Sequence, residues 1–430
     1  MSDWLGGSPH DVALDFGGGA VRYRELARAI GRVALPEGDC VVGCPAGMDP
    51  VELVTTALAA LDRGRPVLIG GSSARFLDRD SDTDSEIDSA SESAGTHAAV
   101  PLERLPVGTE LALLTSGSSG ASAVPRVVAR TSASWLASAQ PLADVTGLDA
   151  RDRIAVTGPL HVSMHLYGVL HALWLGATAG DDLRSATVMH ATPTRLARVL
   201  DGDACPPAVI VAGAATSDEL RSRAAARGIR LTEYYGAAEL SFVLAGGADG
   251  LVPFPGVEVD LRPGPAGDEL WARSPYLALG TVGGGMLRRD DVGFATVGDL
   301  AERTSSGAIR VLGRGDAAIT TAGATVLAEQ VEAQLCALPG VVAAAVVGEP
   351  HELLGQRMVA VVELADGISL DEVASAARER LSAAELPRRW FARALPRTDS
   401  GKVARGAVRE TLVAGGLGTG HPVALERSAS

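Results

Sequence analysis

Residues 111–120 read LALLTSGSSG, and this stretch decides the fold. Its first four residues are apolar and predict a buried β-strand, while the next six are hydroxyl-bearing residues or glycines. Glycines let a backbone turn so that its N–H groups converge, and hydroxyls add hydrogen-bond donors without bulk. Such a loop at the end of a strand forms a nest for a polyphosphate. A flexible Gly/Ser linker is the alternative, but a linker would not follow directly on a buried strand.

On both sides of this loop, strand-like apolar runs alternate with helical patterns, which predicts a largely parallel sheet covered by helices. The expected strands span 40–43, 66–69, 111–114, 154–156 and 208–212, and the expected helices begin near Tyr23 and span 51–61 and 217–227. Residues 251–312 instead predict antiparallel strands at 257–261, 269–273 and 309–312. After Gly313 we expect a helix over 326–338, strands over 341–347 and 358–364, and a helix from the capping box at Ser369 to about Ala384.

These patterns predict an α/β protein of two domains. Residues 1–312 are expected to form a large N-terminal domain of layered α/β subdomains plus a β-subdomain, and residues 313–430 a small, mobile α+β C-terminal domain. Residues 72–98 interrupt the first domain with a strongly polar segment, in which seven acidic residues and one arginine lie between Asp78 and Ser93. This composition predicts a solvated, mobile loop, with an acidic partner-binding segment as the alternative.

The composition argues against several classes of function. The 430 residues carry a formal net charge of −14, whereas non-specific nucleic-acid binding needs a basic face. The acidic, non-apolar start is unlike a signal peptide, and no apolar run approaches the ~20 residues of a membrane span. Cys40 and Cys44 have the spacing of a metal-binding pair, but no second pair or histidine cluster completes a metal site. We therefore expect a cytoplasmic protein without nucleic-acid or membrane partners.

Further motifs follow the 115–120 loop in the chain. They are Gly213-Ala214-Ala215, Tyr234-Tyr235-Gly236-Ala237-Ala238-Glu239, Gly293 to Asp299, Gly313-Arg314-Gly315-Asp316, and a C-terminal run from Pro396 to Lys402. In this order they resemble the adenylate-forming superfamily, which includes acyl-CoA synthetases, luciferases and the adenylation domains of non-ribosomal peptide synthetases. The resemblance runs nearly from end to end of the chain.

The resemblance implies a role for each motif at a nucleotide site. The loop residues Thr115, Ser116, Gly117, Ser118, Ser119 and Gly120 would hold the phosphates of ATP. Tyr235, beside Tyr234 and Gly236, would stack on the adenine, and Gly213, Ala214 and Ala215 would line its pocket. Asp299 would bind both ribose hydroxyls, Arg314 would contact ribose or phosphate, and Glu239 would hold Mg2+.

The catalytic cations and the hinge follow from the same resemblance. Lys402 falls on the family's adenylation lysine, and Asp316 falls on the hinge between the two domains. Arg126 replaces the lysine that ends the family's phosphate loop, and three extra residues precede Pro125. Two further departures are Ala238, where the family has threonine, and Thr320, where it often has lysine.

Residues 158–168 resemble the segment that builds the family's acid pocket. His161, Met164 and His165 are the candidate pocket residues. Amino-acid-activating members place an aspartate here to bind the substrate ammonium, but residues 158–176 contain no acidic residue. We therefore expect a small-molecule carboxylic acid that lacks a free α-amino group and has a partly apolar acyl part.

Three functions remain open at this point. The first is an ATP-dependent acid–thiol ligase with Mg2+ and coenzyme A. The second is a stand-alone adenylation enzyme that loads the phosphopantetheine arm of a carrier protein in trans. The third, motivated by the altered motif residues, is a non-catalytic homologue that binds a nucleotide or acyl-adenylate.

Overall fold

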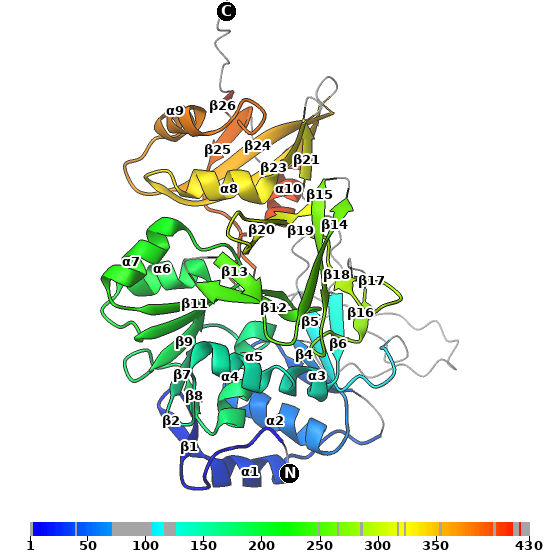
Figure 1. Ribbon diagram of the computed structural model, residues 1–430. Helices are drawn as coiled ribbons and strands as arrows, with labels where there is room; N and C mark the ends of the chain where they lie inside the picture. Colours follow the sequence, from blue (N-terminus) through cyan, green and yellow to red (C-terminus); the bar gives the residue numbers. More distant parts are fainter. Residues whose placement is uncertain are drawn as a thin grey trace, which may run out of the picture.

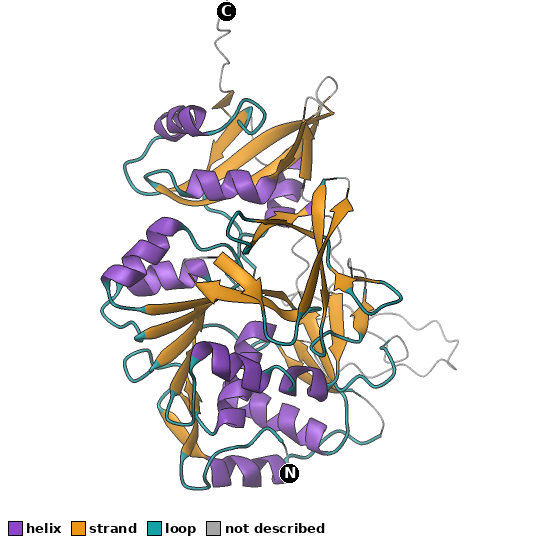
Figure 2. Cartoon of the chain, in the orientation of Figure 1, coloured by secondary structure: helices purple, strands orange, loops and turns teal. Residues whose placement is uncertain are grey.

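The computed structural model describes residues 3–38, 41–70, 105–115, 126–247, 250–264, 266–283, 287–315, 318–321, 324–351, 355–398, 401–415 and 421–422. A large lower part carries the N-terminus, and a smaller part built around its own sheet lies above it (Figure 1). Helices cover the sheets of the lower part and flank the small sheet (Figure 2). This mixed α/β architecture confirms the predicted fold class. The acidic segment 72–98 and the hinge candidate Asp316 lie outside the described residues.

The first sheet carries the strand of the opening motif. Its order is β16-β6-β5-β4-β3, and β3, β4 and β5 are parallel. The strands are β3 (Val42–Pro45), β4 (Val67–Gly70), β5 (Leu111–Thr115), β6 (Arg126–Arg130) and β16 (Gly280–Val282). Helices α1 (Tyr23–Arg32), α2 (Pro50–Asp62), α3 (Ser132–Leu136) and α4 (Ala139–Thr146) belong to the same part of the chain. Asp49 caps α2 by accepting the N–H groups of Val51 and Glu52, which fixes the turn after β3.

The largest sheet begins with parallel pairings and continues with antiparallel ones. Strands β7, β8, β9, β10 and β11 pair in parallel, whereas β12 and β13 follow β11 in antiparallel order. The strands are β1 (Val12–Phe16), β2 (Gly19–Arg22), β7 (Arg153–Val156), β8 (Thr178–Gly180), β9 (Val188–Ala191), β10 (Ala208–Val211), β11 (Arg230–Ala237), β12 (Ser241–Gly247) and β13 (Gly250–Pro253). The helices between them are α5 (Ser163–Leu175), α6 (Pro193–Asp201) and α7 (Asp218–Ala226). The carboxyl ends of the parallel strands therefore lie at one edge, where open α/β sheets bind ligands.

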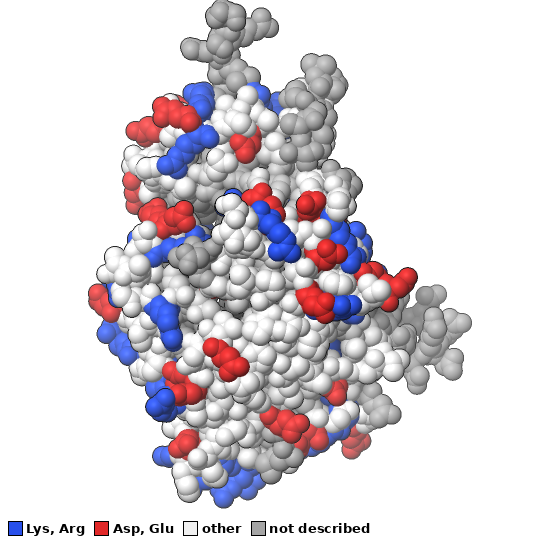
Figure 3. Space-filling view, viewed as in Figure 1, with Lys and Arg blue, Asp and Glu red and all other residues white. Residues whose placement is uncertain are grey.

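The predicted antiparallel region extends this sheet. Its strands are β14 (Glu258–Gly264), β15 (Gly267–Arg273), β17 (Arg288–Arg289), β18 (Ala295–Thr296), β19 (Asp299–Arg303) and β20 (Ile309–Arg314). Strand β20 pairs with β19 and β13, and it spans the boundary expected at residues 312 and 313. On the face of the molecule in Figure 3, acidic and basic side chains are interspersed.

The C-terminal sheet has apolar clusters on both of its faces. Its strands are β21 (Ala318–Thr321), β22 (Ala324–Leu327), β23 (Val341–His351), β24 (Gly355–Leu364), β25 (Arg389–Ala392) and β26 (His421–Pro422), with helices α8 (Ala328–Cys336), α9 (Leu370–Arg380) and α10 (Arg405–Val413). One cluster centres on the buried Trp390 and Leu335, and the other on Phe391 and Leu412. Because each cluster is built largely from residues after 318, this part can pack as a unit.

Two predicted helix boundaries in this part were wrong. Val326 belongs to strand β22, which pairs with β21 in a hairpin, so the helix starts at Ala328. The capping box at Ser369 is confirmed, but its helix ends at Arg380 because Leu381 is extended. No helix in the described part of the chain has the length and apolar character needed to span a membrane.

Candidate functional site

Strands β5 and β6 form a hairpin whose tip is the predicted phosphate loop. Thr115 ends β5 and pairs in register with Arg126, the first residue of β6. The Thr115 hydroxyl donates to the Arg126 carbonyl at 3.3 Å. Ser116, Gly117, Ser118, Ser119 and Gly120 lie outside the described residues, so their phosphate-binding role stays a prediction. The hairpin nevertheless brings both ends of the loop to the edge where Glu239 lies.

Arg126 and Glu239 form a buried ion pair. The Arg126 guanidinium donates to Glu239 Oε1 at 2.8 Å, and the two residues are 8% and 4% exposed. They are separated by 113 positions in the sequence. The predicted phosphate-contacting cation and the predicted metal ligand are therefore neighbours. Their charges compensate each other, as burial requires.

Arg130 is a second buried arginine near the Arg126–Glu239 ion pair. It was not among the residues predicted from the sequence. It lies four residues after Arg126 on β6, on the same face of the strand. Its guanidinium donates to the Ala238 carbonyl at 2.7 Å and lies over the Trp135 ring at 5.2 Å. Burial lowers the pKa of Arg130 to about 9, and the nearby Glu239 opposes this shift. Arg130 thereby fixes the backbone next to Glu239. The available signal was the i, i+4 spacing of two arginines in an apolar strand.

Glu239 fits a magnesium ion that arrives with ATP. Mg2+ is usually bound by one or two carboxylates together with phosphate oxygens and water. Among the described residues no group of three or more His, Cys, Asp or Glu side chains could hold a metal by itself. Glu239 would therefore be one protein ligand of such an ion, and the other ligands would come from the substrate and water.

Tyr235, Asp299 and Arg314 form a connected group. The Tyr235 hydroxyl donates to Asp299 Oδ2 at 2.5 Å, and Arg314 Nε lies 2.9 Å from Asp299 Oδ1. Burial, and then the neighbouring Asp299 charge, raise the pKa of Tyr235 well above its usual value. Burial also raises the pKa of Asp299, while Arg314 opposes that shift. The predicted adenine-stacking and ribose-binding residues thus lie side by side.

Tyr234 and Gly236, the neighbours of Tyr235, have different environments. Tyr234 packs on Phe242 with ring centroids 4.7 Å apart, so it belongs to the apolar core rather than to this group. Gly236 lies at an irregularity in the pairing of β11 and β12, and a Cβ there would be 2.1 Å from the carbonyl oxygen of Ser241. Only glycine fits this close approach.

Lys402 lies beside Gly213 at the same edge. A Cβ built on Gly213 would be 2.9 Å from Lys402 Cε and 3.4 Å from Nζ. Gly213 follows the end of β10 with a φ of +93°, and Ala214 and Ala215 after it are exposed. Lys402 follows Gly401 in a turn closed by the Thr398 N–H, which donates to the Lys402 carbonyl at 2.8 Å. The C-terminal part thus places its lysine against the large part of the molecule.

The electrostatic surroundings of Lys402 link it to the other predicted residues. Water reaches this side chain, but the surrounding protein desolvates the amine and lowers its pKa. Asp299 and Glu239 oppose this shift, whereas Arg314 adds to it. Lys402 is also the only lysine in the 430-residue chain. Charged groups from the turn after β11, from β19, from β20 and from the C-terminal loop therefore meet at one point.

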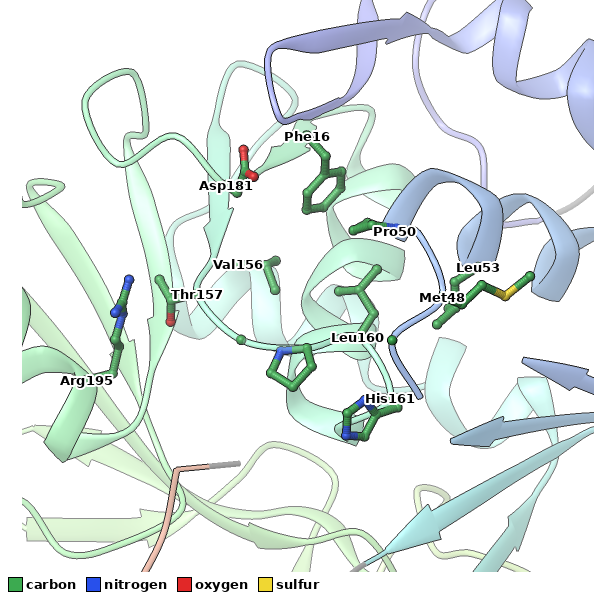
Figure 4. Close-up of a pocket in the computed structure, with 13 residues that line it drawn as sticks. Phe16, Met48, Pro50, Leu53, Val156, Thr157, Leu160, His161, Asp181 and Arg195 are labelled. Atoms are coloured by element: carbon green, nitrogen blue, oxygen red, sulfur yellow. The ribbon is translucent and has the colours of Figure 1, made fainter. Parts of the chain in front are cut away.

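A cavity of about 300 Å³ is lined by residues 156–161 and by Arg195 of helix α6 (Figure 4). His161, a predicted pocket residue, lines it, whereas Met164 and His165 are not among its lining residues. His165 is buried behind the loop at Gly158, and burial lowers the pKa of its imidazole to about 4. Arg195 lines the cavity and was not predicted.

Comparison with known proteins identifies the family. A family model described as the AMP-binding enzyme C-terminal domain matches residues 330–402. The chain is 31% identical over 318 residues to 2-succinylbenzoate–CoA ligase of Escherichia coli (strain K12), and the match covers 69% of this chain and 68% of the relative. The chain belongs to the adenylate-forming superfamily.

Two further likenesses support this membership of the adenylate-forming superfamily. An uncharacterized acyl–CoA ligase of Bacillus subtilis (strain 168), YhfT, is 29% identical over 333 residues, which cover 69% of this chain and 67% of the relative. The solved structure of an E. coli MenE variant with bound OSB-AMS superposes with a TM-score of 0.73 at 25% identity, covering 94% of this chain and 96% of the other. The protein is an AMP-forming enzyme of the acyl-CoA ligase type.

Proposed function

We propose that this enzyme joins a carboxylic acid without a free α-amino group to the thiol of coenzyme A, with ATP and Mg2+, through an acyl-adenylate. The observation that carries the proposal is the position of Lys402. The amine lies at Gly213 and is influenced by Asp299 and Glu239, although these residues are far apart in the sequence. The fold of residues 313–430 alone would not require Lys402 to lie at Gly213, near Asp299 and Glu239.

In the first half-reaction the acid carboxylate attacks the α-phosphorus of ATP, and pyrophosphate leaves. Negative charge grows on the phosphate oxygens, and Lys402 and Arg126 are the side chains that would stabilise it. Tyr235 would stack on the adenine, and Asp299 would exchange its bond to the Tyr235 hydroxyl for bonds to the ribose. Glu239 would hold Mg2+, which neutralises phosphate charge when bound. Arg130 would keep the Glu239 turn in place.

In the second half-reaction the thiol sulfur attacks the acyl carbonyl, the bond to phosphate breaks, and AMP leaves. A lysine that arrives from the small part can also withdraw with it. We therefore propose that residues 313–430 turn as a unit about Asp316 between the two steps. Coenzyme A is the proposed acceptor because the relatives are named as CoA ligases. A carrier protein acting in trans remains the second candidate acceptor.

The test is a pyrophosphate-exchange screen over aryl, short-chain and branched acids, followed by a thioester assay with each active acid. Exchange and thioester formation with coenzyme A are expected. Exchange without CoA thioester, but with acylation of a carrier protein, would favour the second acceptor. No exchange with any acid, at ATP concentrations that saturate binding, would favour the non-catalytic alternative.

A further inference from the structure

The cavity in Figure 4 has one charged side and one apolar side. Phe16, Met48, Leu53 and Leu160 form the apolar side, and Val156 lies between them and the charged side. Arg195, from helix α6, lies on the charged side, whereas Asp181 lies beside Phe16. A cavity of this kind fits a small organic molecule with an apolar body and one polar end.

Arg195 has no counter-ion within the described part of the chain. Its Nε atom is buried without a hydrogen-bond partner, and no carboxylate there forms an ion pair with its guanidinium. Asp181, the acidic residue of the lining, instead accepts the Gly17 N–H at 3.2 Å with each of its oxygens. Arginine donors match a carboxylate in a planar, bidentate geometry. The unpaired guanidinium therefore points to an anionic ligand.

Helix α6 connects this guanidinium to the adenylation site. Thr192 caps the helix by accepting the Arg195 N–H at 3.3 Å, and its methyl group lies 3.6 Å from where a Cβ on Gly213 would be. Arg195 therefore lies about one helical turn (about 5.4 Å) from Thr192. Thr192 in turn lies beside Gly213, which Lys402 contacts. A carboxylate activated near Lys402 and a second anionic group near Arg195 could belong to one small molecule.

We propose that this cavity receives the acyl part of the substrate and that Arg195 pairs with a second anionic group on it. The substrate class is then an organic acid with two anionic groups joined by an apolar linker. This inference rests on the proposed function and narrows its substrate. Arg195 is a specificity-determining residue and takes no part in phosphoryl chemistry. His161 lies on the same lining, and burial, followed by the charges of His161 and Arg195, lowers the pKa of the neighbouring His165.

The experiment compares matched acids that differ in one charge. One pair is 2-succinylbenzoate and 4-oxo-4-phenylbutanoate, and another is adipate and monomethyl adipate. Pyrophosphate exchange is measured for the wild type, Arg195→Met and Arg195→Lys. Arg198→Met is the control, because Arg198 lies on the same helix and is exposed. Melting temperatures of all variants confirm that they fold.

The wild type should prefer the dianionic member by about 10- to 100-fold in kcat/KM, since a hydrogen-bonded charge pair discriminates by this order. Arg195→Met should lose the preference, Arg195→Lys should recover part of it, and Arg198→Met should keep it. Equal rates for the two members in the wild type, or equal effects of Arg195→Met and Arg198→Met, would overturn the proposal.

A binding measurement separates this inference from the proposed function. If no acid supports exchange, the proposed function fails, and the thermal shift produced by 2-succinylbenzoate or adipate then decides the inference by itself. Stabilisation of the wild type that is absent in Arg195→Met supports the site. No stabilisation at millimolar ligand overturns it.

Discussion

Gly213 leaves the space that the Lys402 side chain occupies: a Cβ at position 213 would lie 2.9 Å from Lys402 Cε. The two residues come from opposite parts of the molecule: Gly213 follows β10 of the large sheet, and Lys402 lies in the loop before α10. A side chain at position 213 would therefore displace Lys402 rather than change the reactivity of its amine.

Gly213→Ala should reduce pyrophosphate exchange by about 10-fold or more, because misplacement of a catalytic group by ~1 Å can cost 100-fold. The backbone at 213 has a φ of +93°, so part of any loss could arise from strain. Gly228→Ala is the matched control, since Gly228 has a φ of +69° and nothing within 4 Å of its Cβ position. Comparable loss of exchange in both variants would remove the steric explanation.

Lys402→Ala should lower adenylation by about 100- to 1,000-fold, the usual effect of removing one well-placed donor from an electrostatic cluster. The folded state should remain, because Lys402 makes no apolar core contact in either cluster of the C-terminal part. Single-turnover formation of acyl-AMP measures the step directly, and Lys402→Arg is the charge-keeping comparison. An unchanged rate in Lys402→Ala would contradict the assigned role.

The single lysine allows its titration to be measured without mutation. Desolvation lowers the pKa of Lys402, so its neutral amine should react with an acylating reagent at lower pH than a free lysine, whose pKa is about 10.4. Peptide mass spectrometry separates this site from the N-terminal amine. The unfolded state binds more protons between the two pKa values, so this group makes stability rise with pH in that window. Labelling in urea, where the pKa should return to normal, is the control.

Breaking the Arg126–Glu239 pair should have separable effects on stability and on metal use. Arg126→Met removes the hydrogen-bonded partner of a buried carboxylate, which leaves only the more distant charges of Arg130 and Lys402, and should cost up to about 3–5 kcal/mol of unfolding free energy. Glu239→Gln keeps the shape and a hydrogen bond, so it should cost less but raise the Mg2+ concentration needed for exchange. Urea denaturation and a Mg2+ titration test the two effects. A normal Mg2+ requirement in Glu239→Gln would exclude Glu239 as the ligand.

Buried histidines should make the protein acid-sensitive. Burial lowers the pKa of His171 to about 4 and that of His190 to about 3, against an ordinary value of 6.5. Between these values the unfolded chain binds more protons than the folded one, so stability should fall as pH drops below 6.5. We expect a loss of roughly 1–2 kcal/mol per histidine by pH 5. Urea midpoints at pH 7 and pH 5 measure the loss, which should be smaller in His190→Leu.

Much of the local structure followed from the sequence because the signals were local. Ser217 and Ser369 cap their helices as the patterns predict, and the apolar run at 111–114 forms β5. The prediction that a helix starts at Val326 was wrong because residues 324–327 form a strand that pairs with β21. β-Branched residues fit such a hairpin well.

The site was predictable only where a motif marked it. Lys402, Asp299 and Glu239 stand in recognisable runs, so their convergence could be expected before the structure. Arg130 and Arg195 belong to no such run, and their importance depends on which distant groups pack around them. Arg195 stands out because no counter-ion contacts it among the residues that the structure describes, and a sequence pattern cannot show whether a distant partner is present.

Strand β20 connects the residues around Asp299 to the C-terminal part of the chain. Its last residue, Arg314, pairs in register with Asp299 on β19, and the chain enters the small sheet four residues later at Ala318. If the small part turns as proposed, the connection that carries Lys402 away begins at Arg314, on the strand proposed to bind the ribose. Departure of spent AMP and resetting of the lysine would then be mechanically coupled events.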